Sequence, residues 1–318
     1  MWGGVEGLNA KSSFDDKLNE VLNGIFSSMG GFAMSYFFST TGFLLFYGLS
    51  YKNYASKIKR RIKSLLFPYL IWQCVILIID TIQGQYTFSF QDFFRRTFLL
   101  VRWPINGAMW YVYAVFLMAT LSPLLLPLFS SKKLALVLIL VLLTVIQFRD
   151  SLTNNTTLGA IIHYGYVGNI ITYLPAYLVG SFYGYYKKQD DIPLTYIFYI
   201  ILYTFILDGT ANGSFFNTTT MKMLPIVGIL ILPISKKGVD LWIYRLSFIM
   251  YAIHQPLITD IKPYINHIFQ KSLMPLALIN IFEKATILGA VFLLSFLIYY
   301  IIGKISPRLL SLMTGGRA

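Results

Sequence analysis

The stretch SFIMYAIHQP, residues 247–256, places a histidine inside a long apolar segment. His254 follows Arg245 by nine residues, which is ~13 Å along a helix at 1.5 Å per residue, so we expect its ring near the middle of a membrane. A histidine there can act as a general base, because its ring is largely neutral yet still basic near pH 7. A core histidine that only donates a hydrogen bond to a neighbouring carbonyl explains the residue equally well.

A basic segment precedes the apolar stretch LLFPYLIW, and it contains Lys57, Lys59, Arg60, Arg61 and Lys63. Adjacent arginines offer forked donors that match phosphate oxygens, so a cytosolic phosphorylated donor could bind there. The same charges are also what membrane topology requires at the inner end of a span. Topology is the stronger of the two interpretations.

The aromatic run GAMWYVYAVF, residues 107–116, opens another apolar segment. Trp110, Tyr111 and Tyr113 are typical of the aromatic belt found where spans meet the membrane surface. Stacking against a sugar ring is the sharper alternative, and the local sequence does not decide between them.

The elements that must position these residues are membrane helices. The chain has 318 residues, of which 56% are hydrophobic and only 12% are charged, against about 25% charged in a typical soluble domain. A membrane-spanning helix needs roughly 20 mostly apolar residues. We therefore predict an all-α polytopic membrane protein with nine spans, at 28–50, 65–83, 108–129, 133–148, 167–186, 192–208, 219–235, 243–262 and 283–303.

The net charge of +13 comes from lysines and arginines clustered between these spans. They concentrate in alternate loops, which the positive-inside rule assigns to the cytoplasm. The rule predicts a cytoplasmic C-terminus and, with an odd number of spans, an N-terminus outside. A nucleic-acid partner is not expected.

We predict one membrane domain, residues 28–303, between a polar N-terminal segment, 1–27, and a cytoplasmic tail, 304–318. No metal site is expected, because His163, His254 and His267 lack ligand spacing. The single cysteine, Cys74, excludes an intrachain disulfide and is interpreted as a packing residue.

Five stretches resemble, in order, motifs of the acyltransferase 3 family of membrane acyltransferases. They are YFFSTTGFLLF (36–46), KRRIKSLLFPYLIW (59–72), AMWYVYAVF (108–116), YLPAYLVGSFYG (173–184) and LSFIMYAIHQPLI (246–258). The first has Thr41 where the family usually has serine. Within the family, the chain resembles the polysaccharide and fucose O-acetylase-like branch.

The resemblance implies a bacterial inner-membrane enzyme that usually has ten spans. Such an enzyme moves an acyl group, usually acetyl, from cytosolic acyl-CoA to a hydroxyl of a surface or exported polysaccharide or a lipid-linked glycan. Acyl-CoA is then a substrate, and no bound cofactor is expected. By resemblance, Arg60, Arg61, Trp110 and Tyr251 would bind donor or acceptor, with His254 in a supporting catalytic role.

The chain departs from the family at its start. The family's first span carries an arginine and a histidine regarded as catalytic, whereas residues 1–27 contain no histidine and no apolar span. A start codon assigned too late, a truncated gene, and a complete protein that no longer uses this chemistry would each account for it.

Two other functions compete with acyl transfer. A transporter or flippase for a lipid-linked glycan would more often show paired charges in the membrane or inverted repeats, and neither is evident. A noncatalytic membrane subunit of polysaccharide assembly gains weight if the observed N-terminus is genuine.

Overall fold

The computed structural model describes residues 13–98, 103–148, 167–189, 191–212, 222–224, 227–228, 242–269 and 274–316. All regular structure in these ranges is helical, and no strand occurs in them. The predicted all-α class is therefore confirmed. The principal elements are α1 (Ser13–Phe46), α2 (Tyr51–Arg61), η1 (Ile62–Leu66), α3 (Phe67–Ile82), α4 (Phe90–Phe98), η2 (Gly107–Met109), α5 (Trp110–Thr120), α6 (Ser122–Phe129), α7 (Lys132–Gln147), α10 (Val167–Lys187), α11 (Leu194–Asn212), α14 (Trp242–Phe269), α15 (Leu276–Ile305) and α16 (Pro307–Thr314).

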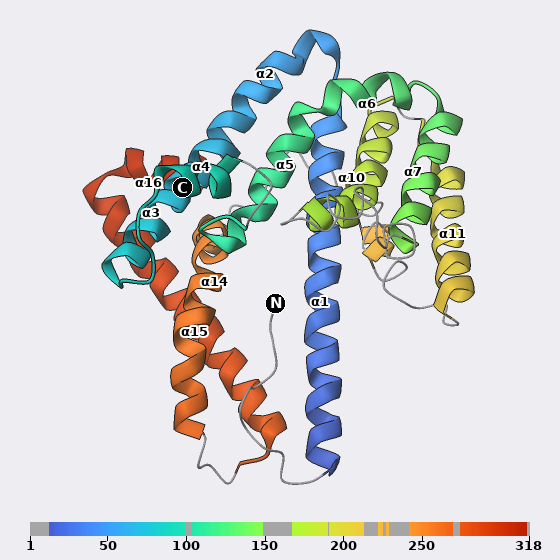
Figure 1. Ribbon diagram of the computed structural model, residues 1–318. Helices are drawn as coiled ribbons and strands as arrows, with labels where there is room; N and C mark the ends of the chain where they lie inside the picture. The colour runs from blue at the N-terminus through green and yellow to red at the C-terminus, as the bar shows by residue number, and fades with distance from the viewer. Residues whose placement is uncertain are drawn as a thin grey trace.

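The long helix α1 stands between two groups of helices (Figure 1). On one side it packs against α10, which contacts α7, and α7 in turn contacts α11. On the other side lie α3, α14, α15 and α16, with α14 packed along α15 and α16 against α3. Helix α5 contacts both α1 and η1, so it connects the two groups.

Among the described residues, three helices are long and apolar enough to cross a membrane, Phe14–Phe46, Tyr51–Ile82 and Leu276–Ile305. A fourth candidate is the pair Gly107–Thr120 and Ser122–Phe129, which is bent by 56° at its junction. Every predicted span overlaps helical residues, although 219–235 lies largely outside the described residues. The number of nine spans stays a prediction.

The first helix begins earlier than the predicted span at 28–50. Residues 13–27 continue α1 without a break, although their polar side chains make them a poor membrane segment. They are helical because several of those side chains bind α15, a long-range contact that hydropathy does not report.

At the C-terminal end of the described chain, α16 is held against α3 by Trp72, whose Nε1 donates to the Met313 carbonyl at 3.1 Å. The predicted domain boundaries stay predictions.

The contact between α1 and α10 depends on glycine. A Cβ added at Gly180 would collide with the Ser39 carbonyl, and one at Gly184 would collide with the Phe43 carbonyl. The spacing of these two glycines is the small-xxx-small pattern that lets membrane helices approach at backbone distance. α1 is therefore held closely along its C-terminal half.

Helices α2, η1 and α3 form one continuous helical stretch with a π turn in the middle. Pro68 has no N–H to donate to the Ser64 carbonyl, and the Phe67 N–H bonds the Ile62 carbonyl, five residues back. The π turn separates the basic end of α2 from the apolar α3.

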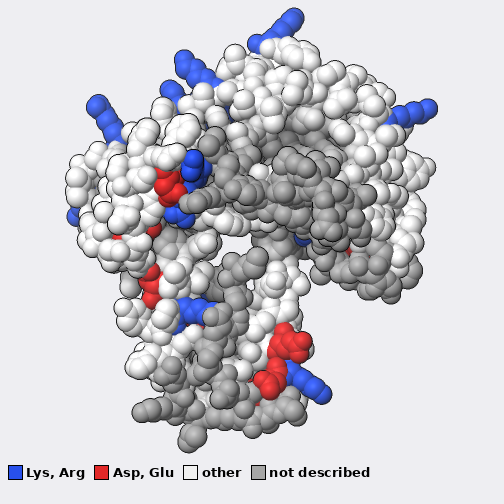
Figure 2. Space-filling model, in the orientation of Figure 1, with Lys and Arg blue, Asp and Glu red and all other residues white. Residues whose placement is uncertain are grey.

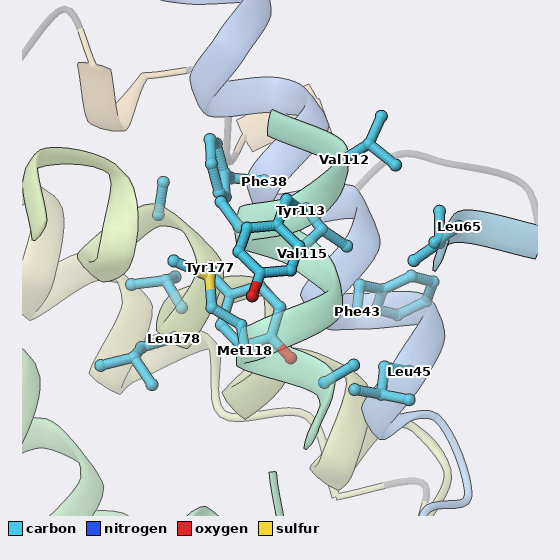
Figure 3. Close-up of a cluster of buried hydrophobic side chains, with 14 of the residues drawn as sticks. Phe38, Phe43, Leu45, Leu65, Val112, Tyr113, Val115, Met118, Tyr177 and Leu178 are labelled. Atoms are coloured by element: carbon cyan, nitrogen blue, oxygen red, sulfur yellow. The ribbon is translucent and has the colours of Figure 1, made fainter. Parts of the chain in front are cut away.

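The main buried cluster lies where α1, α5, α10 and η1 meet (Figure 3). Phe38 and Phe43 from α1 face Val115 and Met118 from α5 and Tyr177 from α10. Tyr113, interpreted above as a belt residue, also belongs to this cluster, because it is only 7% exposed. Its ring stacks on Tyr69 at 4.9 Å, so the belt interpretation is wrong for this residue. Cys74 is exposed on α3 and does not pack in the core, contrary to expectation.

Charged side chains are sparse over the described surface (Figure 2). Basic side chains project along the edge of the molecule that carries α2 and the junction of α6 with α7. At this edge Lys132, the first residue of α7, pairs with Asp191 at 2.6 Å. The broad uncharged surface suits a protein surrounded by lipid.

Candidate functional site

The helix turn that carries His254 is shaped by a proline. Pro256 has no N–H, so the Ala252 carbonyl four residues earlier loses its helical donor. Asn106 supplies the missing hydrogen bond, because its Nδ2 donates to the Ala252 oxygen at 2.9 Å. The turn is thus held by a residue that precedes η2.

The ring of His254 is oriented by its own helix. Its Nδ1 lies 2.6 Å from the Tyr251 carbonyl oxygen. A carbonyl oxygen only accepts hydrogen bonds, so Nδ1 must carry the proton, and in the neutral ring Nε2 keeps its lone pair. This is the tautomer that a hydrogen-bond acceptor or base facing a substrate hydroxyl requires.

Tyr251 joins α14 to the start of α5. Its hydroxyl donates to the Ala108 carbonyl in η2. Its ring lies 5.5 Å from the His254 ring and 6.1 Å from the Tyr111 ring, edge-on to the latter. Tyr251 therefore places His254 beside the aromatic residues of α5.

Tyr111 connects Tyr251 and His254 to α1. Its hydroxyl donates to the Phe37 carbonyl at 3.1 Å and lies 2.9 Å from Thr41 Oγ1. Because the Tyr111 proton is used on the carbonyl, Thr41 is the donor in the second bond. A threonine at position 41, where the family usually has serine, therefore makes a specific contact here.

Trp110 lies among aromatic rings from α1, α10 and the segment that precedes η2. The ring centroids of Phe38, Tyr173 and Trp103 are 5.8, 6.1 and 6.3 Å away. Phe38 also stacks on Tyr173 at 5.3 Å, nearly parallel. Trp110 is half-buried and Trp103 is exposed, so the group presents aromatic surface.

A basic pocket of ≈ 230 Å³ lies between α1 and the α2–η1 junction. Its lining residues are Leu44, Leu45, Lys57, Arg60, Arg61 and Ser64. The cations differ in what they contact. Lys57 Nζ donates to the Leu45 and Tyr47 carbonyls at 2.7 and 3.0 Å, so it caps the C-terminal end of α1.

The side chains of Arg60 and Arg61 lie in different surroundings. Arg60 is exposed, and its Nε reaches the carbonyl of Ser56 in its own helix at 3.5 Å. Arg61 is partly buried, so it is the more inward of the two arginines that line the pocket.

Two of the five predicted site residues adjoin Tyr111: Trp110 precedes it in the chain, and the Tyr251 ring packs against its ring. His254 lies next to Tyr251. Arg60 and Arg61 line the basic pocket. Of the other histidines, His267 is exposed and His163 lies outside the described residues.

Sequence reasoning left Tyr111 open between a belt residue and a sugar-stacking residue. It named Lys57 only as one charge of the basic segment and did not consider Asn106. The proline at position 256 was the available signal for Asn106, because it predicts a carbonyl that needs a donor. It could not identify that donor, which is 146 residues away in the chain.

The helices and the site define an integral membrane protein with a hydrogen-bonded histidine beside aromatic side chains and a basic pocket. The model of a protein family described as an acyltransferase domain matches residues 8–304. The chain therefore belongs to the acyltransferase 3 family, whose members are membrane acyltransferases. No curated protein matches the chain, and no solved structure matches it either.

Proposed function

We propose that this protein is a membrane O-acyltransferase that transfers an acyl group, in the first instance acetyl, from acyl-CoA to a hydroxyl of an exported or surface polysaccharide. It works in the bacterial inner membrane with its C-terminus in the cytoplasm. The observation that carries the proposal is His254, whose ring is fixed in the tautomer that leaves Nε2 free, inside a domain of an acyltransferase family.

The basic pocket is the proposed entry for the donor. Acyl-CoA carries phosphate groups, which arginine binds with its forked donors. Arg60 and Arg61 line the pocket at the end of α2, beside the cluster that the positive-inside rule assigns to the cytoplasm. Arg61 serves as the inner contact because it is partly buried, while the exposed Arg60 binds from the surface.

The reaction forms one bond and breaks another. The acceptor oxygen attacks the thioester carbonyl, the new C–O ester bond forms, the C–S bond breaks, and the hydroxyl proton ends on the CoA sulfur. In this step His254 accepts the hydrogen bond of the acceptor hydroxyl at Nε2 and so orients its oxygen. Its role is supporting, and its partners are the acceptor and Tyr251.

Trp110 and the aromatic residues around it form the proposed binding site for the acceptor sugar. A sugar ring offers an apolar face, and aromatic side chains bind such faces by burying them. Trp110, together with the exposed Trp103, provides aromatic surface at the opening of α5. Tyr251 lies between this surface and His254 through its contact with Tyr111.

The test uses membranes of the source cells that lack or carry the gene. Labelled acetyl-CoA is supplied, and label that mild alkali releases from the polysaccharide fraction is measured. We expect transfer only with the wild-type chain, a loss of about 10²-fold in His254→Ala from lost orientation, and partial recovery in His254→Gln, whose amide oxygen still accepts a hydrogen bond.

Label that reaches no polysaccharide in membranes carrying folded wild-type chain would overturn the proposal and favour a noncatalytic subunit. Movement of a lipid-linked glycan across the membrane without ester formation would favour a flippase. Equal transfer by wild type and His254→Ala would remove His254 from the site while leaving the activity in place.

A further inference from the structure

The residues just before α5 hold one turn of α14 by three contacts. Asn106 Nδ2 donates to the Ala252 carbonyl, and the Tyr251 hydroxyl donates to the Ala108 carbonyl. Between them, the Gln255 side chain lies against Gly107, where an added Cβ would come within 2.7 Å of Gln255 Nε2. The turn held in this way is the one that carries His254.

Asn106 is itself fixed by a residue of α3. The Asn106 N–H donates to Gln73 Oε1 at 3.0 Å, and Gln73 Nε2 donates back to the Asn106 carbonyl at 3.5 Å. Gln73 and Asn106 are both fully buried. The Gln73 side-chain amide thus makes the hydrogen bonds that its burial requires, whereas Asn106 Oδ1 is buried with no hydrogen-bond partner among the described residues.

The position of the His254 ring depends on this turn. The ring nitrogen Nδ1 bonds the Tyr251 carbonyl, which lies one residue before the carbonyl that Asn106 binds. If Asn106 released Ala252, a buried carbonyl would lose its donor, because Pro256 cannot supply one. The turn would then shift to find another partner, and the imidazole would move with it.

We propose that Asn106, locked by Gln73, is a positioning residue: it replaces the helical hydrogen bond lost at Pro256 and thereby aims His254 at the acceptor hydroxyl. This inference rests on the proposed function for its effect on transfer. The hydrogen-bond replacement itself is independent of that function. A displacement of about 1 Å in a catalytic group can cost about 10²-fold in rate, which sets the size of the expected effect.

The experiment is a double-mutant cycle of Asn106→Ala with Pro256→Ala in the full chain. Pro256→Ala returns an N–H that can bond the Ala252 carbonyl and makes Asn106 redundant. With labelled acetyl-CoA and polysaccharide from the source cells, we expect Asn106→Ala to lower kcat about ten- to a hundredfold, with KM for acetyl-CoA changed less than about threefold. In the Pro256→Ala background, Asn106→Ala should lower kcat less than about threefold.

Asn280→Ala is the matched control. Asn280 is equally buried, and it donates to Asn19 and Asn23 in a polar cluster between α1 and α15. Its effect on kcat should be small, and the same with and without Pro256→Ala. Gln73→Met is the second variant for the case in which Asn106→Ala fails to fold. Gln73→Met keeps Asn106 but removes the side-chain amide that holds it. It should lower kcat, as Asn106→Ala does, and it should lower kcat less in the Pro256→Ala background.

Amide exchange of the peptide 250–256 provides a readout that needs no activity. Asn106→Ala should speed exchange in this peptide, and should not do so in the Pro256→Ala background. Independent effects of the two substitutions, in rate and in exchange, would overturn the inference. A wild-type chain that transfers no acetyl group would overturn the proposed function alone, since exchange would still report the replaced hydrogen bond.

Discussion

α1 meets α10 along its C-terminal half and α15 along its N-terminal half, and the two contacts differ in kind. Towards α10, the backbone carbonyls of Ser39 and Phe43 approach Gly180 and Gly184 so closely that no Cβ fits. Towards α15, the contact is made by polar side chains. The Asp15 carboxylate accepts hydrogen bonds from the Leu276 and Ala277 amides at 2.7 and 3.1 Å.

The polar contact continues for about two turns. Asn280 donates to Asn19 and Asn23 at 2.6 and 2.8 Å, and Lys284 donates back to Asn280. Apolar helices in lipid gain little from burying apolar surface, so they associate by close packing of small residues. Towards α15, by contrast, the contact depends on hydrogen bonds between buried or half-buried polar side chains. The two halves of α1 therefore pack by different means.

The half of α1 that packs on α10 is the half that contacts the proposed site. Phe37, Phe38 and Thr41, which contact Tyr111 and Trp110, belong to the half that packs on α10. Among the described residues, the polar half makes its hydrogen bonds to other helices with α15. A change at the glycine contact should therefore affect folding and transfer together, while a change at the polar contact should affect stability alone.

The largest effect is expected from Gly180→Leu. The new side chain would collide with the Ser39 backbone, which cannot move without displacing α1, so the cost should exceed the ~1–3 kcal/mol of ordinary overpacking. We expect little folded protein by size-exclusion chromatography in detergent. Gly289→Leu is the control, because an added Cβ there meets nothing within 4 Å. Equal yields of the two variants would contradict the packing argument.

A smaller effect is expected from Tyr111→Phe. The substitution keeps the ring but removes the hydrogen bonds to Phe37 and Thr41, which costs about 1 kcal/mol of stability. Transfer of labelled acetyl should fall about tenfold, because the group that carries Tyr251 and His254 loses its connection to α1. Tyr113→Phe also removes one hydroxyl, whose bond is to Phe98, and should leave transfer nearly unchanged. Equal losses of transfer in Tyr111→Phe and Tyr113→Phe would show that the Tyr111 hydroxyl has no specific role in transfer.

The smallest effect on transfer is expected from Asp15→Ala. Two amides at the start of α15 lose their acceptor, a change that costs about 0.5–2 kcal/mol when a helix cap is removed. Thermal unfolding in detergent should shift downward, and transfer per folded molecule should stay the same. Asp16→Ala, in the next position and with no such bond to α15 among the described contacts, should shift unfolding less. A loss of transfer in folded Asp15→Ala would show that the two halves of α1 are coupled.

Much of the helical architecture could be predicted, because apolar segments of helical length determine it locally. The segments around Pro68, Trp110 and His254 are helical as expected. The start of α1 could not be predicted, because residues 13–27 are stabilised by Asp15 and its neighbours on α15, more than 250 residues away in the chain. Hydropathy reports only what a segment would do alone.

The site was predictable as a set of residues but not as an arrangement. The motif at 246–258 led to His254 and Tyr251, and the basic segment led to Arg60 and Arg61. Sequence could not show that Arg61 is partly buried while Arg60 is exposed. Adjacent residues on a helix differ in direction by about 100°, and tertiary packing decides which of them faces the protein. Nor could sequence show that Lys57 donates hydrogen bonds to carbonyls at the C-terminal end of α1.

The π turn at Ile62–Leu66 affects how this chain should be aligned with others. A π turn holds one residue more than an α turn, and one residue corresponds to about 100° around a helix. A relative whose helix is regular through this point must be aligned with a one-residue gap here. An ungapped alignment would match either the arginines of α2 or the buried face of α3, which carries Trp72 and Gln73, to the wrong side of the relative's helix.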